Sequence, residues 1–213
     1  MTTVVIDYGS GNLRSAAKAL ERAARESGAD GRVLVTNHAD SLRGASRIVL
    51  PGVGAFADCR RGLAAVPGME DALRHMVIEE KRPFLGICVG MQLLAERGRE
   101  FETVDGLGWI GGEVVPLAPA DPSLKIPHMG WNDLKFRQRH AVFDGIADGA
   151  HAYFVHSYGF APHDSGDVVG EVDYGGPVVA AIARENIVGV QFHPEKSQMT
   201  GLKLIANFLR WRP

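Results

Sequence analysis

A chain of 213 residues with 46% hydrophobic and 23% charged residues has the composition of a globular protein, not of a disordered one. Its 23 basic and 25 acidic residues nearly balance, so its charge indicates neither a nucleic-acid-binding nor an anionic-membrane-binding protein. Two cysteines exclude a disulfide framework, and no membrane-spanning run or signal-peptide pattern is present, so we expect a cytoplasmic protein.

In the first half of the chain, short apolar runs alternate with stretches of helical periodicity. Residues 3–7, 32–36, 47–50 and 83–87 are predicted strands, and residues 13–27, 69–81 and 90–97 are predicted helices. Asn12 is placed to cap the first helix, and Gly28 is placed to end it. Because apolar strands joined by helices are typical of a parallel sheet, the predicted fold class is α/β, with a doubly wound, mostly parallel sheet.

The second half consists mainly of strand-like runs. They cover residues 109–116, 131–136, 152–156, 168–172, 178–184 and 187–192, and residues 200–209 form a predicted terminal helix. Since few helices separate these runs, we interpret them as an antiparallel extension of the same sheet. The loop 117–125 is the best candidate for a linker, but its composition is too ordinary to divide domains. We therefore expect one domain over residues 1–213.

The most specific pattern is Gly86-Ile87-Cys88-Val89-Gly90, which joins a predicted strand to a predicted helix. It has the spacing of a nucleophile elbow, with cysteine in the place of serine. Small neighbours are needed because the nucleophile occupies a strained turn, and the helix start favours a thiolate and offers backbone N–H groups to an oxyanion. The alternative is that Cys88 is a small buried apolar residue, as we expect for Cys59.

A nucleophilic thiol needs a base, and of the eight histidines His193 has the most informative setting. It follows the apolar run 187–192 and precedes Pro194 and Glu195. If the chain stays extended there, residues two apart point to the same side, so Glu195 could orient the His193 imidazole as in a catalytic triad. A histidine beside a strand end is also commonly structural, and the residues alone leave both interpretations open.

Two glycine-containing turns, Tyr8-Gly9-Ser10-Gly11 and Pro51-Gly52-Val53-Gly54, follow predicted strands. In doubly wound sheets, ligands bind beyond the carboxyl ends of the strands. Glycines there allow backbone N–H groups to approach a reacting carbonyl. Ordinary turns have the same composition, so the pattern only places both segments at the expected rim of a site.

Together, these segments resemble the class I glutamine amidotransferases. The resemblance rests on Pro51-Gly52-Val53-Gly54, on Gly86-Ile87-Cys88-Val89-Gly90-Met91-Gln92 and on His193-Pro194-Glu195. Four more segments are similar to those of the glutaminase subunits of imidazole glycerol phosphate synthases: Ile6-Asp7-Tyr8-Gly9-Ser10-Gly11-Asn12, Pro127-His128-Met129-Gly130-Trp131-Asn132, Tyr153-Phe154-Val155-His156-Ser157-Tyr158 and His193-Pro194-Glu195-Lys196-Ser197. The resemblance extends from end to end of the chain.

The resemblance implies hydrolysis of glutamine to glutamate and ammonia. Cys88 would attack the side-chain amide, His193 would shuttle the proton and Glu195 would orient His193. The implied oxyanion hole comprises Gly52, Val53, Gly54 and Val89, and the implied glutamine-binding residues are Gln92, Glu96, Ser157 and Tyr158. We expect Gln92 and Glu96 to face the same way, one turn apart on the predicted helix. No cofactor and no metal are implied.

The resemblance also implies a partner, a (β/α)8 cyclase subunit that consumes the ammonia and makes imidazole glycerol phosphate and AICAR in histidine biosynthesis. The residues that we expect at this interface are Asn12, His128, Trp131, Asn132 and Lys196. Free ammonia is mostly protonated near neutral pH, so a sealed passage between the subunits is chemically sensible. An oxyanion hole that assembles only on demand, through a peptide near Val53, would keep the isolated chain nearly silent.

Three alternatives stay open at this point. The first is an amidotransferase subunit for another acceptor, such as pyridoxal phosphate or anthranilate synthesis, which the segment 127–132 disfavours. The second is a different thiol hydrolase on the same fold, such as a γ-glutamyl hydrolase or a protease-like enzyme. The third is a non-catalytic subunit. The spacing of the histidines and cysteines matches no metal-site motif.

Overall fold

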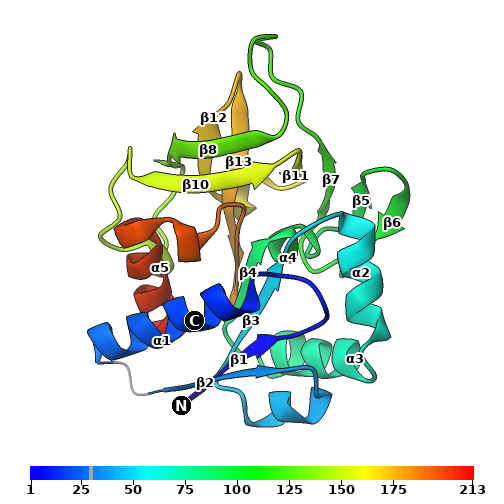
Figure 1. Cartoon of the computed structure of the whole chain (residues 1–213), viewed down its shortest axis with the longest axis vertical. Coiled ribbons are helices and arrows are strands. Elements are labelled where there is room, and N and C mark those ends of the chain that lie inside the picture. The colour runs from blue at the N-terminus through cyan, green and yellow to red at the C-terminus, as the bar shows by residue number, and fades with distance from the viewer. Residues whose placement is uncertain (29–30) are drawn as a thin grey trace.

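Short runs of buried aliphatic residues form the central sheet of the computed structural model, which describes residues 1–28 and 31–213 (Figure 1). Its strand order is β2-β1-β3-β4-β14-β13-β12-β9. The parallel strands are β1 (Thr2–Ile6), β2 (Arg32–Thr36), β3 (Arg47–Gly52), β4 (Phe84–Cys88) and β14 (Ile187–Val190). The antiparallel strands are β13 (Pro177–Arg184), β12 (Val168–Asp173) and β9 (Lys135–Phe136). The predicted α/β fold with an antiparallel extension is therefore confirmed.

Helices cover both faces of the parallel part of the sheet. On one face, α1 (Leu13–Ser27) packs beside α5 (Gln198–Arg210), and α2 (Phe56–Ala65) and α3 (Met69–Arg74) lie on the other (Figure 1). Helix α1 has the predicted bounds, and Gly28 ends it in a left-handed conformation with φ 65°, its N–H bonded to the Ala24 carbonyl. Asn12 stands at the N-cap position, but its side chain makes no capping hydrogen bond.

Two predicted helices differ from those observed. The run 69–81 is α3 followed by a π-helical turn, η2 (His75–Glu79). The run 90–97 is not one helix, because α4 spans only Val89–Gln92. The carbonyls of Leu93, Leu94 and Ala95 accept N–H groups from residues 107–110 instead of continuing the helix, and the chain then enters strand β5 (Arg97–Arg99).

The second half of the chain forms two smaller sheets in addition to the predicted extension of the main sheet. Strands β8 (His128–Asp133) and β10 (His151–His156) form a two-stranded sheet, and a four-stranded sheet has the order β11-β7-β5-β6. The other strands of the latter are β11 (Tyr158–Pro162), β7 (Gly112–Pro116) and β6 (Thr103–Asp105). The remaining short helical turns are η1 (Ala39–Gly44), η3 (Ala141–Phe143), η4 (Ser165–Asp167) and η5 (Pro194–Lys196).

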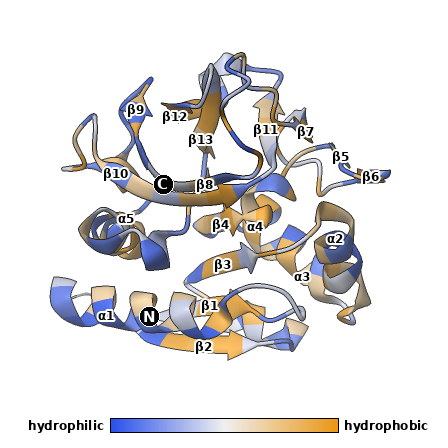
Figure 2. Cartoon of the chain, turned by 45° about the horizontal axis from the view of Figure 1, so that its top comes forward, coloured by the Kyte–Doolittle hydropathy of each residue, from blue (hydrophilic) through white to orange (hydrophobic). Residues whose placement is uncertain are grey.

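The interpretation of the second half as an antiparallel extension of the same sheet is thus wrong for several runs. Residues 112–116 and 152–156 belong to the smaller sheets, and β14 joins the main sheet but runs parallel to β4. Helix α2 and strands β5, β6 and β11 were not among the predicted elements. Apolar residues colour the central strands in Figure 2, whereas the outer faces of the helices are polar. Among the described residues, no helix is both long and apolar enough to span a membrane.

The carboxyl ends of β1, β3, β4 and β14 meet at one edge of the sheet. Parallel pairing places Gly52 of β3 opposite Cys88 of β4, and Val190 of β14 opposite Ile87. The turns that follow these strands must therefore converge on Cys88, where ligands bind in doubly wound sheets.

Candidate active site

Cys88 occupies a strained turn between β4 and α4, with φ 54° and ψ −116°. A non-glycine residue rarely adopts a positive φ, and such strain persists only where the surroundings impose it. A Cβ on Gly90 would lie 1.8 Å from the Leu50 carbonyl oxygen, and one on Gly86 would lie 2.6 Å from the Gly90 oxygen. Both glycines are therefore required for the elbow, as predicted. Helix α4 is only four residues long, so its dipole supports a thiolate less than expected.

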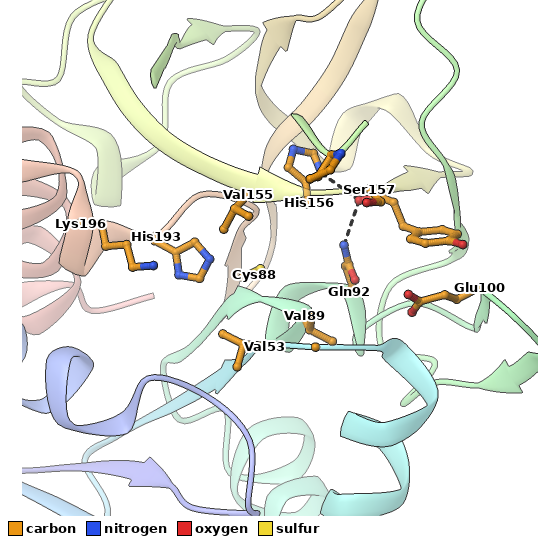
Figure 3. A pocket seen from close by; sticks show the side chains of 13 residues that line it. Val53, Cys88, Val89, Gln92, Glu100, Val155, His156, Ser157, His193 and Lys196 are labelled. Carbon is orange, nitrogen blue, oxygen red and sulfur yellow. Dashed lines mark hydrogen bonds between the residues drawn. The ribbon is translucent and has the colours of Figure 1, made fainter. Parts of the chain in front are cut away.

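His193 and Glu195 meet next to the elbow. The His193 Nδ1 lies 2.9 Å from the Glu195 Oε1, and each side chain is only 3% exposed. The expected contact is present, although residues 194–196 form a 3-10 turn and not an extended corner. Because a carboxylate only accepts hydrogen bonds, Nδ1 carries the hydrogen. The Nε2 is buried without a hydrogen-bond partner among the described residues, and Figure 3 shows the ring directed toward Cys88.

The protonation of His193 reflects two opposed effects. Burial lowers its pKa, but the interactions of the ring with the Cys88 sulfur and the Glu195 carboxylate outweigh burial and raise the pKa to about 9. The imidazole therefore holds a proton at neutral pH, beside the sulfur. A thiol whose proton can be held by an adjacent base is an activated nucleophile.

A buried glutamine pair extends from the thiol to the far wall of the site. The Gln191 Nε2 donates to the Cys88 Sγ at 3.7 Å, and the Gln191 Oε1 accepts from the Gln92 Nε2 at 2.9 Å. The Gln92 Nε2 also donates to the Tyr158 carbonyl at 3.0 Å. Both hydrogens of the Gln92 amide are thus used within the protein, so its Oε1 is the atom left to accept from a ligand.

These groups open into a cavity of about 430 Å³ (Figure 3). It is lined by Val53, Gly54, Cys88, Val89, Gln92, Glu100, Pro127, Val155, His156, Ser157, Tyr158, His193 and Lys196. Most of the residues expected to act on glutamine therefore share one cavity. Glu100, His156 and Gln191 were not among the candidate residues. His156 did lie within a segment that carried the resemblance, whereas nothing in the spacing singled out Glu100 or Gln191.

Glu96 does not share a helix face with Gln92, so that expectation is wrong. Helix α4 ends at Gln92, and the Glu96 carboxylate instead accepts from the Gly112 N–H at 3.3 Å and lies 3.5 Å from the His163 Nδ1. A different carboxylate, Glu100, lines the cavity and accepts from the Phe56 N–H at 2.6 Å.

Ser10 binds both peptide groups that flank Val53. The Val53 N–H donates to the Ser10 Oγ at 3.1 Å, while the Ser10 hydroxyl donates to the Val53 carbonyl at 2.6 Å. The Cys59 Sγ lies 3.3 Å from the same carbonyl. One donor expected for the oxyanion hole is therefore occupied, whereas the Val89 N–H stands in the first turn of α4, where helices lack an internal acceptor.

The residues expected at a partner interface differ in exposure. Trp131 is 47% exposed and Lys196 is exposed at the cavity rim, with its Nζ 5.5 Å from the centroid of the Tyr153 ring. Asn12 and Asn132 are half-buried. His128 is only 2% exposed, so its expected direct contact with a partner is wrong. It is buried because its ring stacks on Phe154 and bonds to His156.

The buried pair His128 and His156 predicts loss of stability in acid. Burial lowers the pKa of each ring to about 4, in His156 against the opposing effect of its bond to the Tyr158 carbonyl. Between that pH and about 6.5, the unfolded chain takes up protons that the folded rings exclude, so stability falls as the pH falls. We expect a loss of roughly 1–2 kcal/mol per histidine from pH 6.5 to 5.

Urea unfolding at pH 7.5, 6.5 and 5 measures this loss. A variant with both His128→Phe and His156→Phe should be less sensitive to pH than the natural chain. Equal pH dependence in the two proteins would show that neither ring titrates on unfolding as described.

Within residues 1–28 and 31–213, no group of three or more histidine, cysteine, aspartate or glutamate side chains could hold a metal ion. The polar groups of the cavity are instead arranged around a thiol. Their geometry suits covalent attack on a carbonyl-type carbon, with acid–base assistance from His193.

Comparison with known proteins places this site in a family context. The family model for "Glutamine amidotransferase class-I" matches residues 4–211. "Imidazole glycerol phosphate synthase subunit HisH" of Rhodospirillum rubrum is 61% identical over 214 residues, with all of both chains covered. The protein of the same name from Brucella suis is 59% identical over 216 residues, again over the whole of both chains.

Solved structures share the fold at lower identity. A glutamine amidotransferase crystal structure matches with a TM-score of 0.72 and 20% identity, covering 97% of each chain. A putative GMP synthase component from Thermoplasma acidophilum matches with a TM-score of 0.69 and 21% identity, covering 99% of this chain and 92% of the other. At such identities the likeness shows the fold alone.

Proposed function

This chain belongs to the class I glutamine amidotransferase family, and from that premise we propose that it is the glutaminase subunit of an imidazole glycerol phosphate synthase. In this role it hydrolyses glutamine and delivers the ammonia for a step of histidine biosynthesis. One observation carries the proposal: the Cys88 thiol sits at a strained elbow, beside a buried His193 whose other nitrogen is bonded to Glu195.

The reaction follows from these three side chains. The protonated His193 already holds the proton given up by Cys88, and the sulfur attacks the side-chain amide carbon of glutamine to form a tetrahedral oxyanion. Collapse of that species breaks the C–N bond, and His193 gives its proton to the leaving nitrogen, so ammonia and a glutamyl thioester result. His193 then takes a proton from water, the hydroxide attacks the thioester, and glutamate leaves as the proton returns to the thiol.

Glutamine recognition is assigned to the far side of the cavity. The free Gln92 Oε1 suits a donor group of the substrate, and the Glu100 carboxylate suits its ammonium group. Ser157 and Tyr158 line the same wall. Glu100 takes the place that we expected for Glu96, whose carboxylate is engaged by Gly112 and His163.

The partner proposed is a (β/α)8 cyclase subunit. Exposed apolar side chains on β8 and just before it support such an interface: Ile126 is 44%, Met129 62% and Trp131 47% exposed. Large apolar groups gathered on one surface commonly mark a protein–protein contact. Together with Asn12, Asn132 and Lys196, this surface would cover the exit of the cavity and keep ammonia from water.

The Ser10 contacts support an oxyanion hole that is incomplete at rest. We expect Ser10→Ala to free the Val53 N–H and raise glutamine hydrolysis by the isolated chain by about tenfold, since the hydrogen bonds that hold the peptides on both sides of Val53 no longer oppose rotation. Activity in the complete complex should change little. Glutamate release by the isolated variant measures this. Ser27→Ala, on the end of α1, is the matched control and should not differ from the natural chain.

An unchanged or lower rate for isolated Ser10→Ala would contradict this account of the resting state. Full turnover by the natural chain without any partner would contradict it as well.

The proposed function is tested by glutamate release from glutamine. The purified chain is assayed alone, with the cyclase barrel, and with the barrel and its ribulosyl-nucleotide substrate. Strong activity only in the complete mixture is expected. Activity on γ-glutamyl peptides but not on glutamine would instead select a γ-glutamyl hydrolase, and no response to the barrel would redirect the search to other ammonia-consuming synthases.

A further inference from the structure

A buried hydrogen-bond chain runs from strand β8 to the wall of the cavity. Its first link is the His156 Nδ1, which lies 2.8 Å from the Tyr158 carbonyl oxygen. A carbonyl only accepts, so Nδ1 carries the hydrogen. In a neutral imidazole the other nitrogen is then bare, and the His156 Nε2 must accept.

His128 supplies the donor that His156 needs. The His128 Nδ1 lies 3.0 Å from the His156 Nε2 and therefore carries a hydrogen. The bare His128 Nε2 in turn accepts from the Asn132 Nδ2 at 3.2 Å, and that amide also donates to the Asp173 carbonyl at 2.9 Å. Each hydrogen bond in this series can therefore run in only one direction, from donor to acceptor. An additional proton on either ring would set two N–H groups against each other.

Packing holds the first ring of the chain in place. His128 is sandwiched between Phe154, at 4.8 Å between ring centroids, and Tyr174, at 4.0 Å. The rings are nearly parallel, with interplanar angles of 18° and 28°. The two stacks fix the plane of the imidazole, and the bonds to His156 and Asn132 fix which edge of the ring faces His156.

The far end of the chain reaches the proposed glutamine site. The Tyr158 carbonyl accepts from His156 and also from the Gln92 Nε2, at 3.0 Å. Figure 3 shows His156 and Gln92 converging on this point from opposite sides. The Tyr158 carbonyl, together with the Gln191 Oε1, thus decides which end of the Gln92 amide faces the protein and which end faces the cavity.

We propose that His128 and His156 are positioning residues of the glutaminase reaction, which aim the Tyr158 carbonyl so that Gln92 presents its Oε1 to glutamine. This inference rests on the proposed function. Neither ring takes part in the chemistry. The hydrogen bond between the neutral His128 and His156 rings also connects the cavity wall to β8. This strand carries the exposed Met129 and Trp131.

Two substitutions of His128 separate the donor from the stack. His128→Phe keeps a ring between Phe154 and Tyr174 but removes the donor to His156. His128→Asn loses the stack but keeps an amide N–H near the position of Nδ1. In the complete complex, we expect His128→Phe to raise KM for glutamine about five- to tenfold with kcat changed less than about threefold, and His128→Asn to stay within about twofold of the natural KM.

Tyr174→Phe is the matched control, because it retains the stack on His128 and loses only the hydroxyl bond to the Lys125 carbonyl. It should leave both constants unchanged. If His128→Asn raises KM as much as His128→Phe does, the rings are structural and the proposal is wrong. If His128→Phe leaves KM unchanged, the proposal is also wrong.

Nitrogen-15 NMR of the histidine rings in the isolated chain tests the geometry independently of turnover. Both rings are expected to show a protonated Nδ1 and a bare Nε2, and His128→Phe should alter the His156 signals. An Nε2–H form of either ring would overturn the proposed chain. If the natural complex hydrolyses no glutamine, the proposed function fails, and with it the role inferred for these rings, whatever tautomers are found.

Discussion

Cys88→Ala is expected to lower glutamine hydrolysis in the complete complex by at least about 10⁴-fold. The thiol at the elbow forms the thioester, so its loss removes the covalent route. Glutamate release at saturating glutamine, with the cyclase barrel and its nucleotide substrate present, measures the loss. Ammonia supplied directly should still be consumed by the barrel.

The fold should survive this substitution, because alanine is smaller than cysteine and keeps the Cβ at the strained turn. Thermal unfolding and glutamine binding by Cys88→Ala serve as controls, and both should remain close to those of the natural chain. A residual rate above about one hundredth of the natural rate would mean that another group attacks the amide, and the proposed triad would be wrong.

Glu195→Gln is expected to lower kcat by about 10²- to 10⁴-fold, since its carboxylate holds the His193 Nδ1–H and stabilises the charged ring. It should also shift the pH profile. The Glu195 hydrogen bond and charge help to raise the pKa of His193 to about 9 against burial. Without that charge the ring loses its proton at lower pH, so the alkaline limb of kcat/KM should move down in pH.

The matched control is Glu79→Gln. Glu79 makes the same kind of contact, its Oε2 lying 2.8 Å from the His75 Nδ1, but both side chains are 56% exposed and precede β4, at the opposite end of that strand from Cys88. That variant should keep the natural rate and pH profile. An unshifted alkaline limb in Glu195→Gln would show that this carboxylate does not support the charge on His193.

Local patterns predicted the parts of the fold in which each element carries its own signal. Helix α1 has an amphipathic repeat and a terminal glycine, and its predicted bounds are correct. The length of helix α4, in contrast, is not determined by its own sequence. Its apolar periodicity continues past Gln92, but the carbonyls of Leu93 to Ala95 are taken by a loop from residues 107–110. That competition comes from a distant segment and is invisible in the local sequence.

The direction of a strand relative to its neighbours could not be predicted from the local sequence either. A buried apolar run such as 187–190 reads the same whether its neighbours are parallel or antiparallel. Pairing with β4 makes β14 parallel, and this pairing brings His193 to the end of the strand next to Cys88. Because Cys88 and His193 are far apart in the sequence, only the topology of the sheet brings them close together.

The elbow was predictable from the chain itself, because it is a local backbone requirement and Gly86, Cys88 and Gly90 are close neighbours in sequence. What tertiary packing decided is which other groups face the thiol. Glu100 replaced Glu96 in the cavity wall, Ser10 captured the Val53 peptide, and His128 moved from an expected surface to a buried stack. Each of these outcomes depends on contacts between segments far apart in the chain, and such contacts are set by how the strands pair and the layers pack, not by residue spacing.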